Sequence, residues 1–354
     1  MGTPRCWPAA LAGASVLLLA ACTSRGAGVP AGAGAPNTPP SVASSSPAPS
    51  ASPVAPDSTS APDTAAGPGS GVSTWPGAAV SATAIPLGDG RVTTTSPQQG
   101  YVYSCTSQFR GGGARHSGPW IDTAAGTYSS VAKVQVAGAN PWPSASHSFT
   151  VSGANRILAT DDLPTGATTG NFPISPGDPA YQYDTNPNSV RAQSFTWTVP
   201  AEPSAATTPQ CLGLGPIGVS EDGVLFFDAL DDAGRDAGAH EVQDSCAGHP
   251  QRQGTYHYHT YSPCLATAAS AQPGSSTLVG YAADGYGMYV ERDSHGDLPT
   301  DADLDACHGR TSSVTWDGKQ VVMYHYDITT EYPYTLGCYH GTPVNTHQAA
   351  PSGP

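Results

Sequence analysis

Six cysteines constrain the fold of this 354-residue chain more than any other feature of its sequence. They are spread between residues 105 and 338, whereas two further cysteines lie within the first 22 residues. Six cysteines in an exported chain indicate three disulfides, and none has the C-x-x-C spacing of a zinc or redox site. Because bridged cysteines have no free thiolate, a metal bound here must use nitrogen and oxygen ligands. The six are Cys105, Cys211, Cys246, Cys264, Cys307 and Cys338.

The start of the chain has the features of an export signal. Arg5 supplies a positive charge, and Ala9–Ala21 is an apolar run too short to cross a membrane as a helix. The run ends in L-A-A-C at Cys22, which resembles the lipobox of bacterial lipoproteins. This resemblance implies a lipoprotein signal peptide over residues 1–21, a lipidated Cys22 and an extracytoplasmic protein anchored to the cell membrane. The alternative is an ordinary cleavage site at which a cysteine falls by chance.

Residues 22–97 consist almost entirely of Ala, Pro, Ser, Thr and Gly. Such a segment cannot bury enough apolar surface to offset the entropy lost on ordering, and proline-rich chains are semi-extended. We therefore expect a disordered tether over residues 22–97, a folded domain over residues 98–346 and a disordered tail over residues 347–354.

The domain is predicted to be mainly β. The chain has 41 glycines, 35 prolines and only 11% charged residues, which argues against a helical protein. Only Asp228–Gln243 favours a helix or an ordered loop, and Asp317-Gly318 predicts a hairpin turn. We predict a β-rich sandwich or barrel-like domain with long loops, stapled by three disulfides. The predicted strands are Val131–Val136, His147–Val151, Ser194–Val199, Val224–Phe227, Tyr256–His259, Leu278–Ala282, Gly287–Val290, Ser313–Trp316 and Gln320–Tyr326.

Charge and motif content exclude several functional classes. The formal net charge is −14 and the 13 basic residues are scattered singly, which argues against nucleic-acid binding. The sequence has no nucleophile elbow, no Walker loop and no H-E-x-x-H motif, so a nucleotide cofactor is not expected. A glycosidase with paired carboxylates stays open, because carboxylate separations do not follow from sequence. The sequence does not decide whether the protein is an enzyme.

The densest group of potential ligands lies in Asp244–Cys264, which reads D-S-C-A-G-H-P-Q-R-Q-G-T-Y-H-Y-H-T-Y-S-P-C. In its centre, Tyr256–His259 alternates strictly between tyrosine and histidine. Residues two apart on a strand point to the same face, so both histidines share one face and both tyrosines the other. Two imidazoles on one face can converge on a metal ion. The alternative is that these residues only fill the surface of a β-sheet.

The same stretch resembles the signature of the YHYH-domain protein family. The resemblance extends from about residue 101 to residue 346 and implies a secreted or surface location and a shared site, without naming a reaction. It rests on Gly215–Val224, Asp244–Cys264, Leu278–Tyr289, Asp303–Arg310, Met323–Tyr326 and Pro333–Gly341.

A shorter copy of the motif occurs near the C-terminus, where Tyr324–Asp327 reads Y-H-Y-D. Each copy is followed by a cysteine, which suggests two similar strands, as neighbours in one sheet, that contribute to one site. We therefore expect His257, His259 and His325 to share one ion in a cleft reachable by solvent, with His249 or Asp244 completing the coordination. Imidazole donors suit a divalent metal ion, with zinc or copper most compatible.

Four further residues are candidates for orienting the histidines or for replacing one of them as a ligand. Asp303 and Asp305 belong to an alternating acidic run that lacks the glycine and glutamate of an EF-hand, and His308 lies close to them. The family resemblance makes Asp284 the fourth candidate.

Loop lengths suggest a pairing for the cysteines. Cys246–Cys264 and Cys307–Cys338 would close short loops around the two Y-H-Y strands and brace the site. By elimination, Cys105 would then pair with Cys211.

Three functions are compatible with these features. The first is a surface-anchored lipoprotein that binds a metal ion through the histidine cluster. The second is a metal-dependent hydrolase or oxidase that acts on an envelope substrate, and the third is an adhesion or structural module without metal. The expected partners are the membrane, through the lipid anchor, and an envelope or extracellular small molecule or polymer. An open coordination position in a cleft would favour an enzyme, whereas a closed site would favour binding.

Overall fold

The computed structural model describes residues 74–265 and 271–346. The leader, Cys22, most of the tether and the tail lie outside the described residues, so the predictions made for them are not tested. Within the described ranges, no helix is long and apolar enough to cross a membrane.

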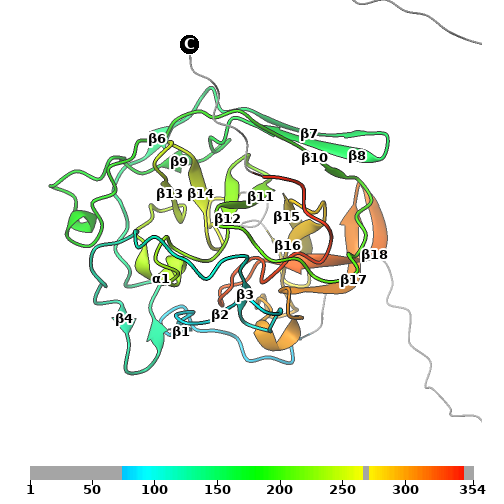
Figure 1. The fold of residues 1–354 in the computed structure, drawn as a ribbon, viewed down its shortest axis with the longest axis horizontal. Coiled ribbons are helices and arrows are strands. Elements are labelled where there is room, and N and C mark those ends of the chain that lie inside the picture. The colour runs from blue at the N-terminus through cyan, green and yellow to red at the C-terminus, as the bar shows by residue number, and fades with distance from the viewer. Residues whose placement is uncertain (1–73, 266–270, 347–354) are drawn as a thin grey trace, which may run out of the picture. The chain divides into compact units, whose positions relative to one another are not determined.

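The prediction of a mainly β domain with long loops is confirmed, and the fold is organised around one eight-stranded sheet (Figure 1). The sheet is open, with β13 and β17 at its two edges. In spatial order its strands are β13 (Gly248–Pro250), β14 (Tyr256–Tyr258), β12 (Leu225–Phe227), β11 (Pro216–Ser220), β15 (Ser276–Ala282), β16 (Gly287–Glu291), β18 (Lys319–Asp327) and β17 (Gly309–Trp316).

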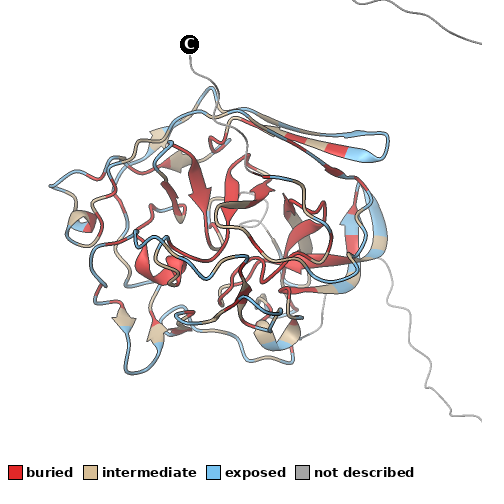
Figure 2. Cartoon of the chain, in the orientation of Figure 1, coloured by how far each residue is buried: buried red, intermediate tan, exposed pale blue. Residues whose placement is uncertain are grey.

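The central strands are buried on both faces (Figure 2). Phe226, Tyr258, Met288 and Tyr326 are each 0% exposed. Strands covered on both sides carry continuous runs of apolar and aromatic residues instead of a simple alternation. This explains why Val224–Phe227 could be assigned from a short apolar run.

The eight strands form two similar halves that meet between β11 and β15. We call residues 216–264 the first half and residues 276–338 the second half. Gly218 pairs with Ala282, and Ser220 pairs with Gly280. Gly218 and Gly280 are equivalent positions of the two halves, and so are Ser220 and Ala282. Exchanging the two halves therefore turns one of these pairs into the other, which is the register expected when a local twofold axis relates the two halves.

Each half has the same succession of elements. Each half begins with an antiparallel hairpin, β11–β12 or β15–β16. In the sheet, the second strand of that hairpin pairs with a parallel strand, β14 or β18. An antiparallel edge strand, β13 or β17, completes the half. Both hairpins turn at Asp-Gly, with the left-handed glycines Gly223 and Gly285 at φ +92° and +93°.

The loop before each edge strand is also repeated. Asp244 accepts hydrogen bonds from the backbone N–H of Cys246 and Gly248, and Asp305 accepts them from Cys307 and Gly309. A Cβ on either glycine would lie 2.3–2.4 Å from the hydroxyl of the tyrosine that packs over it. The motif D-x-C-x-G therefore needs glycine at its fifth position for a steric reason.

Ten shorter or peripheral strands surround the main sheet. They form a three-stranded sheet β10 (Phe195–Pro200), β8 (Asn155–Thr160) and β7 (His147–Ser152), a second three-stranded sheet β1 (Ile85–Pro86), β5 (Thr127–Tyr128) and β4 (Ile121–Asp122), and the pairs β2 (Val92–Thr93) with β3 (Val102–Tyr103) and β6 (Asn140–Pro141) with β9 (Thr168–Thr169). Among the described residues, helix is confined to α1 (Ala237–His240) and two 3₁₀ turns, Pro179–Gln182 and Asp301–Asp303.

Two of the sequence-based predictions are wrong, one predicted strand and the start of the folded domain. Val131–Val136 is not a strand, because Val131 is 71% exposed and only Val136 makes a bridge, so an alternating pattern there has no partner strand. The folded part also begins before residue 98. The Trp75 indole donates to the carbonyl of Asp297, and Ile85 is 3% exposed. A few widely spaced apolar residues are therefore enough to hold the end of the predicted tether against the folded domain.

All three disulfides pair as predicted. They are Cys105–Cys211, Cys246–Cys264 and Cys307–Cys338. The last two occupy equivalent places, since each links the D-x-C-x-G loop of its half to the segment after the Y-H-Y strand.

Candidate metal centre

Three histidines of the first half converge at the edge of the main sheet. His249 on β13 lies directly opposite His257 on β14, and directly opposed residues of an antiparallel pair share a face. His259 follows two residues after His257 and returns to the same face. Each of the three offers a nitrogen within 4.8 Å of the others. The local strand pattern therefore brings together the three histidines that the sequence placed in one stretch.

Glu241 completes the group from the opposite side. It is the residue at which α1 ends, and its Oε2 lies 3.2 Å from His249 Nε2 and 3.3 Å from His259 Nε2. The Nε2 atoms of His257 and His259 are 3.1 Å apart. Donors around a tetrahedral zinc ion with bonds of about 2.1 Å lie about 3.4 Å from one another. The three histidines and Glu241 are named here the histidine site. The three histidines lie mutually within reach of one ion, and Glu241 approaches two of them at a separation close to this value.

The hydrogen bonds of the rings fix which nitrogens face the centre. His257 Nδ1 lies 3.2 Å from the carbonyl of Thr255, and His259 Nδ1 bonds the carbonyl of Asp228. A carbonyl only accepts, so both Nδ1 atoms carry the proton. In neutral rings, both Nε2 atoms then present lone pairs to each other at 3.1 Å. Such an arrangement is stable only with a cation between them, either a proton or a metal ion.

The charges around the centre are consistent with this requirement. Burial, together with the adjacent His249 and His259, holds the pKa of His257 well below its usual value. Burial also lowers the pKa of His259, but the hydrogen bond and charge of Glu241 outweigh it and raise that pKa overall. Burial opposes ionisation of Glu241, but the charges of and hydrogen bonds from His249 and His259 bring its pKa well below the usual range. The site thus holds one carboxylate anion and at least one neutral imidazole.

The prediction of a solvent-reachable cleft is wrong. His249, His257 and His259 are 5%, 3% and 4% exposed, and Glu241 is 8% exposed. The ring of Phe227 stacks on His257 with centroids 3.9 Å apart, which closes one side. Because all four side chains are buried, the site is closed.

His325 does not join the histidine site, contrary to the prediction. It lies on β18, five strand positions from β14 in the sheet, which corresponds to about 24 Å at the usual spacing. The two Y-H-Y strands are equivalent members of the two halves and are not neighbours. His325 instead lies with Glu291 and Asp327 in a separate cluster.

Asp244 is also not a ligand of this site. Its two oxygens accept hydrogen bonds from the Tyr256 hydroxyl at 2.9 Å and from the backbone N–H of Gly170, Cys246 and Gly248. Tyr256 points to the face of β14 opposite His257, so Asp244 braces the back of the strand. Proximity in sequence suggested a ligand, but the strand alternation separates the two faces.

The remaining candidates have structural hydrogen bonds of their own in the second half. Asp284 accepts from the Tyr326 hydroxyl, Asp303 caps the turn at Thr300, and Asp305 accepts from the Tyr324 hydroxyl. His308 bonds Thr329 and lies 3.3 Å from Asp301. No contact described for these four residues reaches the histidine site.

Sequence reasoning missed Glu241 and Glu291. Glu241 precedes the D-S-C-A-G-H run by three residues, so a wider window would have included it. Glu291 ends β16 and is brought to β18 only by the parallel pairing of those strands.

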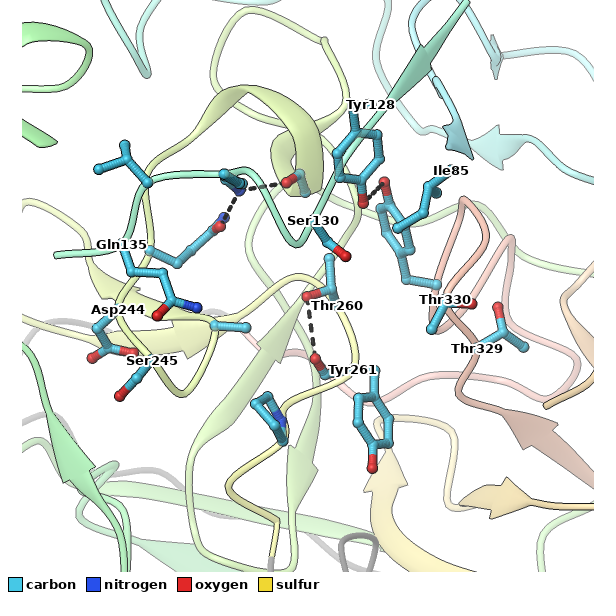
Figure 3. Close-up of a pocket in the computed structure, with 17 residues that line it drawn as sticks. Ile85, Tyr128, Ser130, Gln135, Asp244, Ser245, Thr260, Tyr261, Thr329 and Thr330 are labelled. Carbon is cyan, nitrogen blue, oxygen red and sulfur yellow. Dashed lines mark hydrogen bonds between the residues drawn. The ribbon is translucent and has the colours of Figure 1, made fainter. Parts of the chain in front are cut away.

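A pocket of about 260 Å³ has none of the four residues of the histidine site in its lining (Figure 3). Asp244 and Thr260 line it, and Lys133 reaches across it to bond the Gly238 carbonyl and the Gln243 side chain. Burial lowers the pKa of Lys133 to about 8. Because the ammonium is already held by two acceptors, it is a bridge between the loop 128–135 and α1.

Comparison with known proteins identifies one relationship. Residues 196–298 match the model of a family described as YHYH protein. The resemblance is therefore supported over the first half and the centre of the sheet, which includes the histidine site. The match ends before Asp303–Arg310 and the second Y-H-Y strand. No curated protein and no solved structure matched this chain.

Proposed function

We infer that this protein is an extracytoplasmic metal-binding protein, held at the cell surface through Cys22, and that the histidine site carries one zinc or copper ion. The observation that carries this proposal is the 3.1 Å approach of the Nε2 atoms of His257 and His259, whose Nδ1 atoms are both committed to carbonyls. Three imidazoles and one carboxylate are a donor set suited to these ions.

The closed geometry favours retention of the ion over catalysis. A catalytic zinc keeps one coordination position for water or substrate, whereas a structural site has four protein ligands. Here the three histidines and the adjacent Glu241 carboxylate are all buried, and Glu241 stands where a fourth ligand would be needed. The ion would tie α1 to the edge of the sheet, or would be stored until the edge opens.

Metal analysis of the full chain, purified without chelators, tests this proposal. We expect one zinc or copper ion per chain and its loss in His257→Ala. The matched control is His147→Ala, a partly exposed histidine outside every cluster of potential ligands among the described residues. A wild-type protein that takes up neither ion when supplied with Zn²⁺ and Cu²⁺, or a His257→Ala variant that retains as much as the wild type, would refute the histidine site.

The cellular location has its own test. Three disulfides support a location outside the reducing cytoplasm. For the anchor, Cys22→Ser should release the protein into the medium or leave an uncleaved precursor. Membrane association unchanged by this substitution would contradict lipidation.

A further inference from the structure

A second cluster of potential ligands lies in the second half, away from the histidine site. His325 Nε2 is 3.5 Å from Glu291 Oε1 and 3.9 Å from Asp327 Oδ2. One ligand atom from each of the three residues lies within 4.8 Å of the others. Glu291 reaches the cluster from the end of β16, and the other two come from one face of β18.

The cluster contains buried polar atoms without partners. His325 and Asp327 are both 0% exposed. Among the described residues, His325 Nε2 and both carboxylate oxygens of Asp327 have no hydrogen-bond partner. A buried carboxylate without hydrogen bonds is costly, so the geometry requires either a proton or a cation among these atoms.

The ring of His325 is oriented as a ligand would be. Its Nδ1 lies 3.1 Å from the carbonyl of Met323, so Nδ1 carries a proton and Nε2 faces the two carboxylates. His257 makes the corresponding bond to Thr255, two residues before it. The same backbone arrangement therefore directs one histidine of each half toward its cluster.

The position in the fold gives an independent argument. His325 lies opposite Arg310 across β17 and β18, as His257 lies opposite His249 across β13 and β14. Asp327 follows His325 by two residues, as His259 follows His257. The second cluster thus occupies the place in its half that the histidine site occupies in the other.

We propose that Glu291, His325 and Asp327 form a second divalent cation site, chemically distinct from the histidine site. Two carboxylates and one imidazole favour an oxygen-preferring ion such as Mn²⁺ over the ions that suit three imidazoles. This proposal does not depend on the function proposed for the first half.

Arg310 sets the charge of the second site. Its Nε bonds Glu291 Oε2 at 2.8 Å and lies 4.0 Å from Asp327 Oδ2, which leaves Glu291 Oε1 facing His325. Two carboxylates, one guanidinium and a divalent ion sum to +1. The histidine site, with one carboxylate and a divalent ion, has the same total. The guanidinium is also covered by the Trp75 ring, 4.7 Å away.

Manganese binding to the full chain tests this inference. The chain is first loaded with one equivalent of Zn²⁺ and then titrated with Mn²⁺, and free Mn²⁺ is followed by its electron paramagnetic resonance signal. We expect the wild type to bind one Mn²⁺ tightly and the isosteric Asp327→Asn variant to bind at least tenfold more weakly. Glu291→Gln should act in the same direction if Asp327→Asn fails to fold. His257→Ala should lose zinc and keep manganese.

A third group, Asp293, His295 and Asp297, of which only the last two are exposed, is unchanged in all these variants, so a difference between them reports the site at Glu291, His325 and Asp327. A wild type that binds no Mn²⁺ would mean that the cluster is balanced by a proton, and would overturn the inference. A folded Asp327→Asn variant that binds manganese as the wild type does would place the ion elsewhere and would also overturn it. Zinc retention is a separate readout, so neither result bears on the histidine site.

Discussion

The two halves of the main sheet have the same framework and different polar clusters. Both have an Asp-Gly hairpin, a D-x-C-x-G loop, a disulfide and a Y-H-Y strand, and their tyrosines bond equivalent aspartates. On the histidine face, His249, His257 and His259 in one half correspond to Arg310, His325 and Asp327 in the other. The tyrosine face therefore maintains the fold, and the histidine face is where the halves differ in chemistry.

The largest expected effect comes from exchanging the ligands of the second half for those of the first. The double substitution Arg310→His with Asp327→His places imidazoles at the positions equivalent to His249 and His259, beside Glu291. We expect zinc retention to rise from one to two ions per chain, measured by metal analysis after dialysis. The control is Arg310→His alone, which should add no tightly held zinc. A double variant that folds and still retains one zinc ion would show that the halves are not equivalent in geometry.

Removing the equivalent disulfides should give the next largest effect. The loops closed by Cys246–Cys264 and Cys307–Cys338 span 18 and 31 residues. In the chain-entropy model, each bridge stabilises the fold by about 3 kcal/mol. We expect a paired Cys→Ala substitution in either half to cost about that much, measured by denaturant unfolding. Only the loss of Cys246–Cys264 should also weaken zinc binding, because that bridge holds the loop before His249. Equal zinc affinity in both variants would contradict this coupling.

The tyrosine face should respond to smaller changes. Tyr256 donates to both oxygens of Asp244 at 2.9 Å and is 0% exposed, whereas Tyr324 donates to one oxygen of Asp305 at 3.1 Å and is 9% exposed. Hydrogen bonds to charged groups contribute about 1.5–3 kcal/mol. We expect Tyr256→Phe to lower the free energy of unfolding by about 2 kcal/mol and Tyr324→Phe by about 1 kcal/mol. The reverse order would indicate that burial does not set the strength of these bonds.

The smallest expected difference concerns pH. Burial raises the pKa of Asp222 and of its counterpart Asp284, although tyrosine hydroxyls and backbone N–H groups oppose this increase. A carboxyl group with a raised folded-state pKa contributes stability below its unfolded pKa, near 3.9, and loses that contribution as the pH rises through the folded value.

The free energy of unfolding of the wild type, minus that of Asp222→Asn, should therefore decrease as the pH rises from about 4 toward neutral, because only the wild type has this carboxyl group to ionise. The expected slope is about 1.4 kcal/mol per pH unit between the unfolded and the folded pKa of the carboxyl group. Asp284→Asn should behave in the same way, as measured by chemical unfolding across this range. Opposite pH slopes in the two variants would show that the tyrosine faces of the two halves differ, contrary to our expectation.

The sequence alone determined much of this protein. The mainly β class, the two short-loop disulfides and the shared face of His257 and His259 were predicted, because each depends on short-range spacing or strand alternation, and Cys105–Cys211 followed by elimination. His249 was predicted only as an alternative to Asp244, and His325 was wrongly included. The Asp317-Gly318 hairpin and the strands near His147, Phe195 and Leu225 were predicted for the same reason.

Tertiary structure alone decided the partners of these residues. Strand order placed His325 five strands from His257, although the repeated motif suggested neighbours. Parallel pairing brought Glu291 to His325, and the end of α1 brought Glu241 to the histidines. Long-range pairing also left Val131–Val136 without a strand to join. The period of a strand fixes which side chains share a face, but the identity of neighbours across a sheet depends on loop paths that local pattern does not encode.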